Sequence, residues 1–223
     1  MVITIDGPVA AGKTSTARRL ANRIPFSLLD TGAIYRSVAL QASQSDLDWH
    51  DEASMIRVAR ELEIRFQLEG KVNRVMVGEL DVTEAIRRPS ISRGASIVSA
   101  LPGVRSALLS LQRDYASTND VIAEGRDTGT VVFPQAETKF FLTATPEVRA
   151  GRRYRELEEN GIEIDLESVQ NELQERDHRD SNREVAPLVP APDAVTIDST
   201  MMDLEQVLNT MLGCLPAALR ADP

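Results

Sequence analysis

A glycine-rich stretch with one lysine and one hydroxyl side chain lies near the start of the chain. The letters GPVAAGKT, residues 7 to 14, match G-x-x-x-x-G-K-S/T, in which glycines let the backbone wrap a phosphate chain and free amides at a helix start donate to it. Lys13 is expected to reach the β- and γ-phosphates, and Thr14 to lie near Mg²⁺. The sequence therefore predicts a nucleoside triphosphate site, formed by Gly7, Pro8, Val9, Ala10, Ala11, Gly12, Lys13, Thr14 and Ser15. A guanine-reading NKxD motif is absent from the sequence, which disfavours a GTPase.

Two further stretches place basic residues just after predicted strands. In DTGAIYR, Thr31 is expected to cap a helix, with Tyr35 and Arg36 on its first turns. In EGRDTGTVVFP, Arg126 and Asp127 follow a strand, where an isolated Arg-Asp pair is more often structural. Together with the lysine of the glycine-rich loop, these arginines supply more positive charge than one triphosphate needs. A second phosphate group, carried by the molecule that accepts the transferred phosphate, is the simplest interpretation.

The stretch QERDHRDSNR has two interpretations. Arg176, Asp180 and Arg183 fall at i, i+4 and i+7 and would share one face of a helix. A charge run of this kind is usually a solvated face with salt bridges. The predicted cleft favours the alternative, in which these three side chains face a substrate. Arg179 and Asp177 lie off that line, so we expect them to be exposed or to contact a lid.

Short apolar runs separated by helical segments must position these residues. The runs cover residues 2–6, 26–30, 121–125, 138–144 and 194–198. Continuous apolar strands that alternate with helices are typical of a parallel sheet buried on both faces, so we predict a doubly wound α/β fold with five strands flanked by helices. Ligands of such sheets bind beyond the carboxyl ends of the strands.

One segment departs from this alternation of strands and helices. Residues 62–83 alternate apolar and polar side chains at period two around EGKVN and GEL, which predicts a small antiparallel meander inserted into the α/β core. Residues 91–115 then return to helical periodicity, and the three prolines of residues 186–193 predict rigid connecting chain.

The composition sets limits on class and partners. A chain of 223 residues suits one large domain or a core with a small insertion, and a net charge of -9 disfavours a nucleic-acid binder or a membrane-surface protein. Only three of the 25 basic residues are lysine, and arginine grips phosphate through two hydrogen bonds at once. The excess of arginine over lysine can also reflect codon composition, and we give weight to both explanations.

The only cysteine, Cys214, excludes an internal disulfide and favours a reducing compartment. We expect it to pack as a small core residue. The sequence has no apolar segment of about 18 residues and no basic stretch before a long apolar run, so we predict a cytoplasmic protein.

The sequence resembles a known family, the bacterial cytidylate kinases among the nucleoside monophosphate kinases. The resemblance runs nearly end to end and rests on VITIDGP with AGK, LLDTGAIYR, ASIVSALPGVRSALL, EGRDTGTVVFP, ERDHRDSNR with VAPLVPAPDA, and IDST, in that order. DTGAIYR and GRDTGTVVFP are more diagnostic than the phosphate loop. Two positions depart from the family's common pattern: Ala10 stands where glycine is frequent, and Ile34 replaces the usual methionine.

The resemblance implies ATP as donor, Mg²⁺ as cofactor, and CMP, dCMP and more weakly UMP as acceptor nucleotides. It implies that the cytosine ring is read by Ser96, Arg105 and Asp127. The monophosphate would be held by Arg36, Arg126 and Arg183, with Thr31 and Tyr35 beside them, and the ribose by Arg176 and Asp180. A carboxylate can accept from cytosine's exocyclic amine but would meet repulsion from uracil's oxygen, which supports the base assignment for Asp127.

The resemblance also implies a division of the single domain, residues 1–223. The core would comprise residues 1–60 and 118–223, the monophosphate-binding insertion about 61–100, and a lid about 150–166. We expect Arg152 or Arg153 in the lid to face the transferred phosphate, beside the catalytic Lys13, Arg126 and Arg183. The alternative for this lid segment is an exposed helix with Arg–Glu pairs.

The implied activity is transfer of phosphate from ATP to CMP or dCMP by a monomer that binds neither nucleic acid nor membrane. Two alternatives remain open from the residues themselves: a kinase of similar fold for another small molecule, and a non-catalytic switch that binds ATP.

Overall fold

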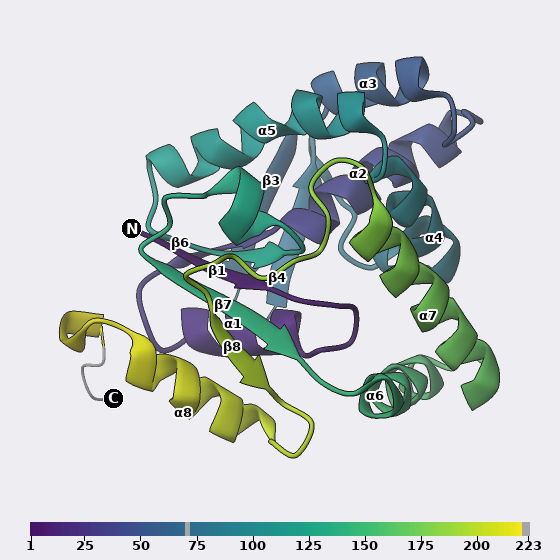
Figure 1. The fold of residues 1–223 in the computed structure, drawn as a ribbon. Helices are drawn as coiled ribbons and strands as arrows, with labels where there is room; N and C mark the ends of the chain where they lie inside the picture. The colour runs from purple at the N-terminus through teal and green to yellow at the C-terminus, as the bar shows by residue number, and fades with distance from the viewer. Residues whose placement is uncertain (70–71, 220–223) are drawn as a thin grey trace.

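The computed structural model describes residues 1–69 and 72–219 and contains the predicted parallel sheet. Its strand order is β2 (Ser27–Asp30), β6 (Val121–Gly125), β1 (Val2–Asp6), β7 (Thr138–Thr143) and β8 (Val195–Asp198), and every neighbouring pair is parallel (Figure 1). The predicted strand bounds differ from the observed ones by no more than one residue. The doubly wound α/β fold is therefore confirmed.

Three neighbouring strands, β1, β2 and β6, have an acidic residue at or next to their carboxyl ends. Asp6 of β1 is in register with Gly125 of β6, and Glu124 of β6 with Asp30 of β2. Because the strands are parallel, their carboxyl ends meet along one edge of the sheet. Three buried carboxylates, Asp6, Asp30 and Glu124, consequently lie at the edge where a ligand is expected.

Two hydrophobic cores cover the two faces of the sheet. On one face, Ile3, Ile5 and Ile122 pack against α1 (Lys13–Ala21) and α8 (Leu204–Cys214). On the other face, Val121 and Ala123 pack against α2 (Thr31–Gln44), α4 (Pro89–Val98) and α5 (Pro102–Ser117). Side chains of β6 alternate between these cores, as the period of two along a strand requires.

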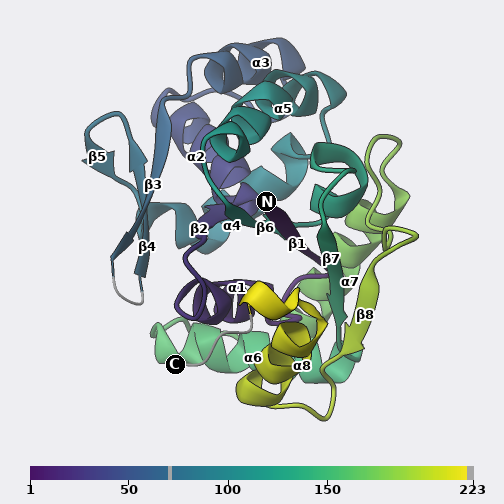
Figure 2. The ribbon, with the colours of Figure 1, turned by 90° about the vertical axis from the view of Figure 1, so that its left-hand side faces the viewer.

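The predicted meander is confirmed as a three-stranded antiparallel sheet. It consists of β3 (Ile64–Glu69), β4 (Val72–Val77) and β5 (Leu80–Asp81), and lies to one side of the central sheet (Figure 2). Residues 70 and 71 of the quoted EGKVN stretch lie outside the described residues. The helix α3 (Glu52–Arg60) precedes this sheet, and the short 3-10 helix η1 (Ala85–Arg87) follows it.

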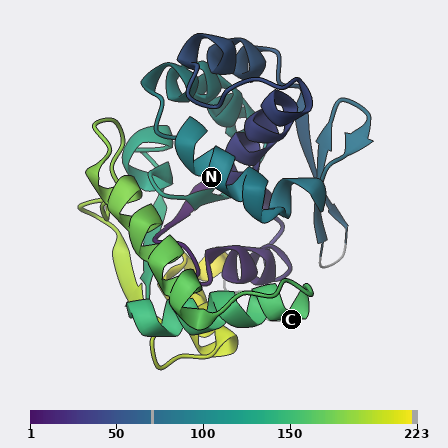
Figure 3. The same cartoon turned by 90° about the vertical axis from the view of Figure 1, so that its right-hand side faces the viewer.

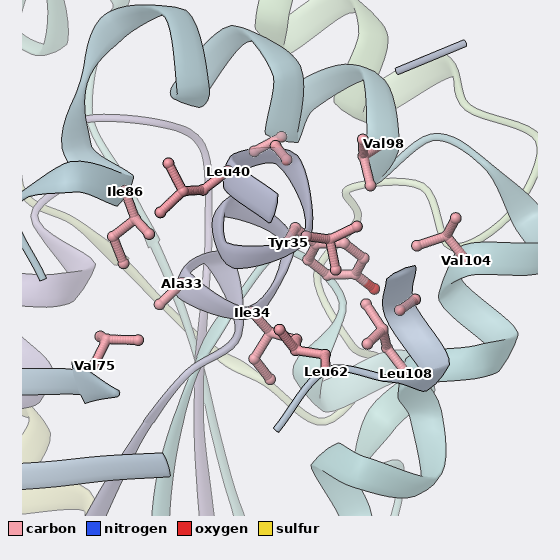
Figure 4. Close-up of a cluster of buried hydrophobic side chains, with 14 of the residues drawn as sticks. Ala33, Ile34, Tyr35, Leu40, Leu62, Val75, Ile86, Val98, Val104 and Leu108 are labelled. Atoms are coloured by element: carbon pink, nitrogen blue, oxygen red, sulfur yellow. The ribbon is translucent and has the colours of Figure 1, made fainter. Parts of the chain in front are cut away.

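A continuous apolar cluster joins the inserted sheet to α2. Val75 of β4 and Ile86 of η1 are buried in the same cluster as Ala33 and Leu40 (Figure 4). Burial of each large apolar side chain contributes about 1.5–3 kcal/mol, so this cluster holds the insertion firmly against α2. The helix α2 thereby carries both Tyr35 and the attachment of the insertion.

The chain forms a helical hairpin from α6 (Pro146–Glu159) and α7 (Leu166–Asn182) (Figure 3). A small cluster of Ala150, Leu157, Val169 and Leu173 holds the two helices together. The segment expected to form a lid, about residues 150–166, covers most of α6 and the connection to α7. A turn of π-helix, η2 (Thr128–Val132), and the 3-10 helix η3 (Ala217–Leu219) complete the elements.

Two local predictions are wrong. The cap of α2 is Asp30, whose carboxylate accepts from the amide of Ala33 at 2.8 Å, because Thr31 is already helical and donates its hydroxyl to the carbonyl oxygen of Glu124. Cys214 is exposed, because the buried face of α8 consists of Val207, Leu208 and Met211, and the cysteine at the end of the helix lies off that face.

Among the described residues, no single helix has the length and apolar composition needed to cross a membrane. The pair α4 and α5 meets that test jointly, by length and composition only, with a bend of 99° between the two helices.

Candidate active site

The loop between β1 and α1 has the conformation of a phosphate cradle. Gly12 precedes α1 with φ 99°, and Gly7 has φ 151° and lies so close to Leu142 that an added Cβ would be 2.0 Å from its carbonyl oxygen. Ala10 adopts φ 59°, a left-handed conformation that costs a non-glycine residue about 1–2 kcal/mol. That strain accounts physically for glycine being common at this position in the resembled family.

Lys13 begins α1 and spans the loop. Its ammonium group is buried and donates to the carbonyl oxygen of Pro8 at 2.7 Å. Burial and the nearby Arg126 guanidinium hold the pKa of Lys13 well below its ordinary value. A phosphate placed in the loop would favour the charged form of this side chain and so raise its pKa.

Thr14 meets a carboxylate from the neighbouring strand. Its hydroxyl donates to Glu124 Oε2 at 2.9 Å, while Glu124 Oε1 is buried with no partner among the described residues. Burial raises the pKa of Glu124 to about 7, and the nearby Asp30 acts in the same direction. A hydroxyl beside an oxygen without a partner is a donor set that suits Mg²⁺, which prefers oxygen ligands.

Asp127 is held by two arginines on the other side of the cleft. Arg105 pairs with Asp127 Oδ2 and Arg183 with Oδ1 at 3.2 Å, and all three side chains are less than a tenth exposed. The Arg105 guanidinium also lies 5.5 Å from the centre of the Tyr35 ring, within cation–π range. The site thus contains a fully braced, buried carboxylate.

Two further arginines of the site pair with carboxylates, one at the end of β2 and one on α7. Arg126 Nε donates to Asp180 Oδ2 at 2.8 Å, and Arg36 pairs with Asp30 at 2.8 Å. Arg126 and Asp127, neighbours in sequence, therefore have separate partners rather than each other.

Arg176 makes no ion pair within the described chain. Burial and the nearby Arg126 lower its pKa to about 10, so it stays cationic at neutral pH. Arg176 and Asp180 share one face of α7, whereas the helix ends at Asn182 and Arg183 follows in extended backbone. The predicted stripe of three therefore consists of two helical residues and the cap residue, and all three line the cleft.

The side chains described above enclose a cavity of about 390 Å³. Nine cationic side chains in its wall face five carboxylates. The cations are Lys13, Arg18, Arg36, Arg87, Arg105, Arg126, Arg153, Arg176 and Arg183, and the carboxylates are Asp30, Glu124, Asp127, Glu156 and Asp180. In a chain whose net charge is -9, this concentration of positive charge indicates polyanionic ligands.

Five of the predicted site residues lie outside the cavity wall. Ser96 is buried on α4 and accepts from Arg179 Nε at 3.2 Å. Arg152 donates to the carbonyl oxygen of Ser199 at 2.8 Å and to its hydroxyl at 3.0 Å, which leaves Arg153 as the lid arginine that lines the cavity. Ala11 lies beneath the loop surface, as do Gly7 and Pro8.

The two residues predicted to lie off the helical line make specific contacts. Asp177 pairs with Arg149 of α6 at 2.7 Å, and Arg179, half-exposed, donates to the hydroxyl oxygen of Ser96 on α4. Asp177 thus contacts the other helix of the hairpin, at a residue that precedes the segment predicted as the lid, about residues 150–166.

Several residues of the site were missed by sequence reasoning. Arg18 and Arg87 line the cavity, Glu124 meets Thr14, and Arg149 donates to the carbonyl oxygen of Val9 at 3.3 Å. The signal for Glu124 was available, because a carboxylate inside an otherwise apolar buried strand is costly unless it is used.

A phosphate loop at the carboxyl edge of a parallel sheet, facing a second cavity wall rich in arginine, defines the class of kinases that use a nucleoside triphosphate. A family model described as cytidylate kinase matches residues 3–216. The chain belongs to the cytidylate kinase family, as the resemblance predicted.

Individual relatives agree across almost the whole chain. A cytidylate kinase from Mannheimia succiniciproducens is 48% identical over 213 residues, covering 96% of this chain and 95% of that protein. Cytidylate kinases from Aeromonas hydrophila and Vibrio cholerae are 45% and 43% identical, covering 95% and 98% of this chain and 92% and 97% of those proteins.

Proposed function

We propose that the protein transfers the γ-phosphate of ATP to CMP or dCMP, giving ADP with CDP or dCDP. The observation that carries this proposal is the braced Asp127 carboxylate, which lines the same cavity as Lys13 and Thr14 of the phosphate loop. Membership of the cytidylate kinase family supports the choice of cytidylate. A single cavity then holds a triphosphate and a cytosine nucleotide together.

Asp127 would read the base. A carboxylate oxygen accepts from cytosine's exocyclic amine and repels the oxygen of uracil, so UMP would be a weaker acceptor nucleotide. Arg105, which braces Asp127, would contact the ring from the same side. Ser96 would join them after a small movement of α4, since its hydroxyl lies behind the cavity wall.

The remaining arginines would hold phosphate and ribose. Arg36, Arg126 and Arg183 would bind the monophosphate beside Thr31 and Tyr35, and Arg176 and Asp180 would reach the ribose. The buried Nε atoms of Arg36 and Arg176 have no acceptor within the described residues, so these donors are available to a ligand.

Thr14 and Glu124 would hold Mg²⁺, since the threonine hydroxyl lies beside a buried carboxylate oxygen that lacks a partner. When bound, the ion would neutralise negative charge on the β- and γ-phosphates.

The chemical task is electrostatic. The acceptor phosphate is already an anion near neutral pH, so no side chain has to remove a strongly held proton, and His50 and His178 lie exposed away from the cavity. Lys13 and the arginines would align two polyanions and neutralise the charge that spreads over the transferred group. Closure of the lid, about residues 150–166, would bring Arg153 to that group and exclude water.

A coupled assay that measures ADP production with CMP, dCMP, UMP and AMP tests the proposal. We expect CMP and dCMP to be the best acceptor nucleotides and UMP to be weaker. AMP as the best acceptor nucleotide would contradict the specificity. Phosphorylation of only a non-nucleotide would favour the other small-molecule kinase, and ATP binding without stimulated ADP production would favour the switch.

The proposal extends to the setting of the enzyme. We propose a cytoplasmic monomer that binds neither nucleic acid nor membrane, in keeping with the acidic net charge. Its core would comprise residues 1–60 and 118–223 and its monophosphate-binding insertion about 61–100. Gel filtration with light scattering would test the monomer.

A further inference from the structure

One of the three buried carboxylates at the sheet edge has no role in the function proposed above. Asp30 pairs with an arginine of the site and Glu124 with a threonine, whereas Asp6 ends β1 directly before the phosphate loop. It is buried and forms no ion pair within the part of the chain that the structure describes. Burying a carboxylate without a cationic partner is costly unless hydrogen bonds compensate it, so the contacts of Asp6 are informative.

Asp6 accepts three hydrogen bonds from the start of η2. Its Oδ1 accepts from the amide of Thr128 at 2.9 Å and from the hydroxyl of the same residue at 2.8 Å, and its Oδ2 accepts from the amide of Gly129 at 2.7 Å. Burial raises the pKa of Asp6, and these bonds oppose that shift. The side chain at the end of β1 therefore fixes the backbone of a segment that lies 122 positions further along the chain.

These bonds replace a cap that η2 does not make for itself. Asp127 immediately precedes the turn, at the position where an aspartate normally accepts from the free amides of a helix start. It makes no such bond, and its two oxygens instead pair with Arg105 and Arg183. Because Asp6 satisfies the free amides, the carboxylate of Asp127 can face the cavity.

The other end of η2 is held by Arg113 of α5. Its Nε donates to the carbonyl oxygen of Val132 at 2.9 Å, and one of its terminal nitrogens donates to that of Val131 at 3.0 Å. Between these two ends lies a single turn of π-helix, a rare conformation that is frequent at functional sites. A single turn has few hydrogen bonds of its own, so side chains from β1 and α5 fix its position.

We propose that Asp6 is a positioning residue, which caps η2 and thereby holds Arg126 and Asp127, the two residues before the turn, toward the acceptor nucleotide. Asp6 also directly precedes Gly7, so one carboxylate ties the phosphate loop to this pair. Arg113 supports the same turn from its other end. The anchoring of η2 stands on the hydrogen bonds, while its effect on CMP rests on the proposed function.

Hydrogen exchange without nucleotide tests the anchor. In Asp6→Asn an NH₂ group replaces one carboxylate oxygen and cannot accept, so one amide of η2 loses its acceptor. The amide of Thr128 or of Gly129 should therefore exchange at least tenfold faster than in wild type. The control Asp203→Asn alters an exposed carboxylate that caps α8 and should leave both amides unchanged. Unchanged exchange of both amides in Asp6→Asn would overturn the anchor even if the protein is an active CMP kinase.

Kinetics test the effect on the acceptor nucleotide. Asp6→Asn should lower kcat/KM for CMP about 10- to 100-fold and lower its ratio to kcat/KM for UMP, with KM for ATP changed less than about threefold. Arg113→Gln should lower both quantities by about three- to tenfold, since it loosens the same turn from its other end. The control Arg57→Gln removes an exposed arginine that bonds Ser54 within α3 and should change neither quantity.

A combined variant shows whether Asp6 acts through Asp127. In the Asp127→Asn background, Asp6→Asn should leave the ratio for CMP and UMP unchanged, because the carboxylate that it positions is already absent. A further fall of the ratio in that background would overturn the proposal.

A purely structural role for Asp6 predicts a different result. It would lower the melting temperature of Asp6→Asn and leave KM for CMP and the ratio for CMP and UMP unaltered, which would overturn the proposal. If Asp6→Asn does not fold, Arg113→Gln decides, and an unaltered ratio in that variant would have the same consequence. A wild-type enzyme that does not prefer CMP to UMP would contradict the proposed function, and the exchange rates would still decide the anchor.

Discussion

Two guanidinium groups hold the carboxylate of Asp127, one at each oxygen. This bracing fixes the direction of the carboxylate before any nucleotide arrives, which lowers the cost of ordering it on binding. Neither partner of Asp127 could be assigned from sequence spacing, because Arg105 and Arg183 lie 22 and 56 positions away.

Replacing Asp127 by alanine or asparagine should reduce kcat/KM for CMP more than for UMP. Removal of the base-reading carboxylate is worth about 1–3 kcal/mol of discrimination, so the ratio of the two kcat/KM values should fall roughly 5- to 150-fold. The asparagine variant keeps the shape of the side chain and limits unfolding caused by unpaired buried arginines. Equal losses with CMP and UMP would show that Asp127 does not read the base, and Asp114→Asn on the outside of α5 serves as control.

Glu124 should make the stability of the protein without nucleotide depend on pH. Its pKa is about 7 in the folded chain against 4.5 as the ordinary value, so the folded state binds more protons between those limits. The free energy of unfolding should therefore fall as pH rises from about 4.5 to 7, by on the order of 3 kcal/mol from this group, and then level off.

Urea unfolding of wild type and Glu124→Gln at pH 5, 6, 7 and 8 measures that effect. The glutamine variant should lose stability less steeply across this range. The control is Glu158→Gln, an exposed carboxylate on α6. Parallel curves for wild type and Glu124→Gln would mean that Glu124 ionises normally.

At the scale of the elements, the loop between β1 and α1 depends on its contact with β7. Gly7 can lie against the Leu142 carbonyl only because it has no Cβ. Gly7→Ala should therefore lower the free energy of unfolding by about 3 kcal/mol or more, through both the clash and the strained φ. Gly151→Ala, inside α6 with no neighbour near its added Cβ, should raise it by about 1 kcal/mol. Chemical denaturation of both variants gives the comparison, and equal stability of Gly7→Ala and wild type would contradict the tight contact.

The helix α6 contains two adjacent arginines, Arg152 and Arg153, for which we expect different roles. Arg152 ties the helix to the Ser199 backbone, so Arg152→Ala should lower the free energy of unfolding by about 1–3 kcal/mol. Arg153 lines the cavity, so Arg153→Ala should lower kcat at least tenfold with little change in stability, since arginines on a transferred phosphate contribute about 10³–10⁵ in related systems. Steady-state kinetics beside urea unfolding separates the two effects. The reverse pattern would exchange the two assignments.

Strands could be predicted where the pattern that indicates them lies within a short stretch of sequence. The five strands were recognisable because each is a short apolar run that ends in polar residues, and the meander because it alternates at period two. The cap of α2 could not be predicted, because Asp30 and Thr31 both suit a cap. The exposure of Cys214 could not be predicted either, because only packing decides which face of α8 is buried. The ionisation of Glu124 depends on Asp30 and Lys13, which three separate segments bring together.

At the scale of the whole molecule, an acidic protein surrounds a cationic cleft. The net charge is -9, yet cations outnumber carboxylates in the cavity wall nine to five. Such a field concentrates anionic substrates in the cleft, and added salt screens it over about 8–10 Å at physiological concentrations.

Raising KCl from 50 to 500 mM should therefore increase KM for CMP and for ATP severalfold, with a smaller effect on kcat. The melting temperature of the protein without nucleotide should rise over the same range, because the unpaired cations of the cleft repel one another less. Steady-state kinetics and calorimetry measure the two responses. KM values that do not respond to KCl would contradict the role given to the cleft's field.

The exposed position of Cys214 has a practical consequence. The only thiol of the chain lies at the end of α8, on the face of the sheet opposite α2 and the insertion. A maleimide dye should therefore attach at one defined place, outside the cleft. A second cysteine introduced at the exposed Glu79 next to β5 would accept a partner dye, and energy transfer between the two dyes would follow movement of the insertion in single molecules as nucleotides bind.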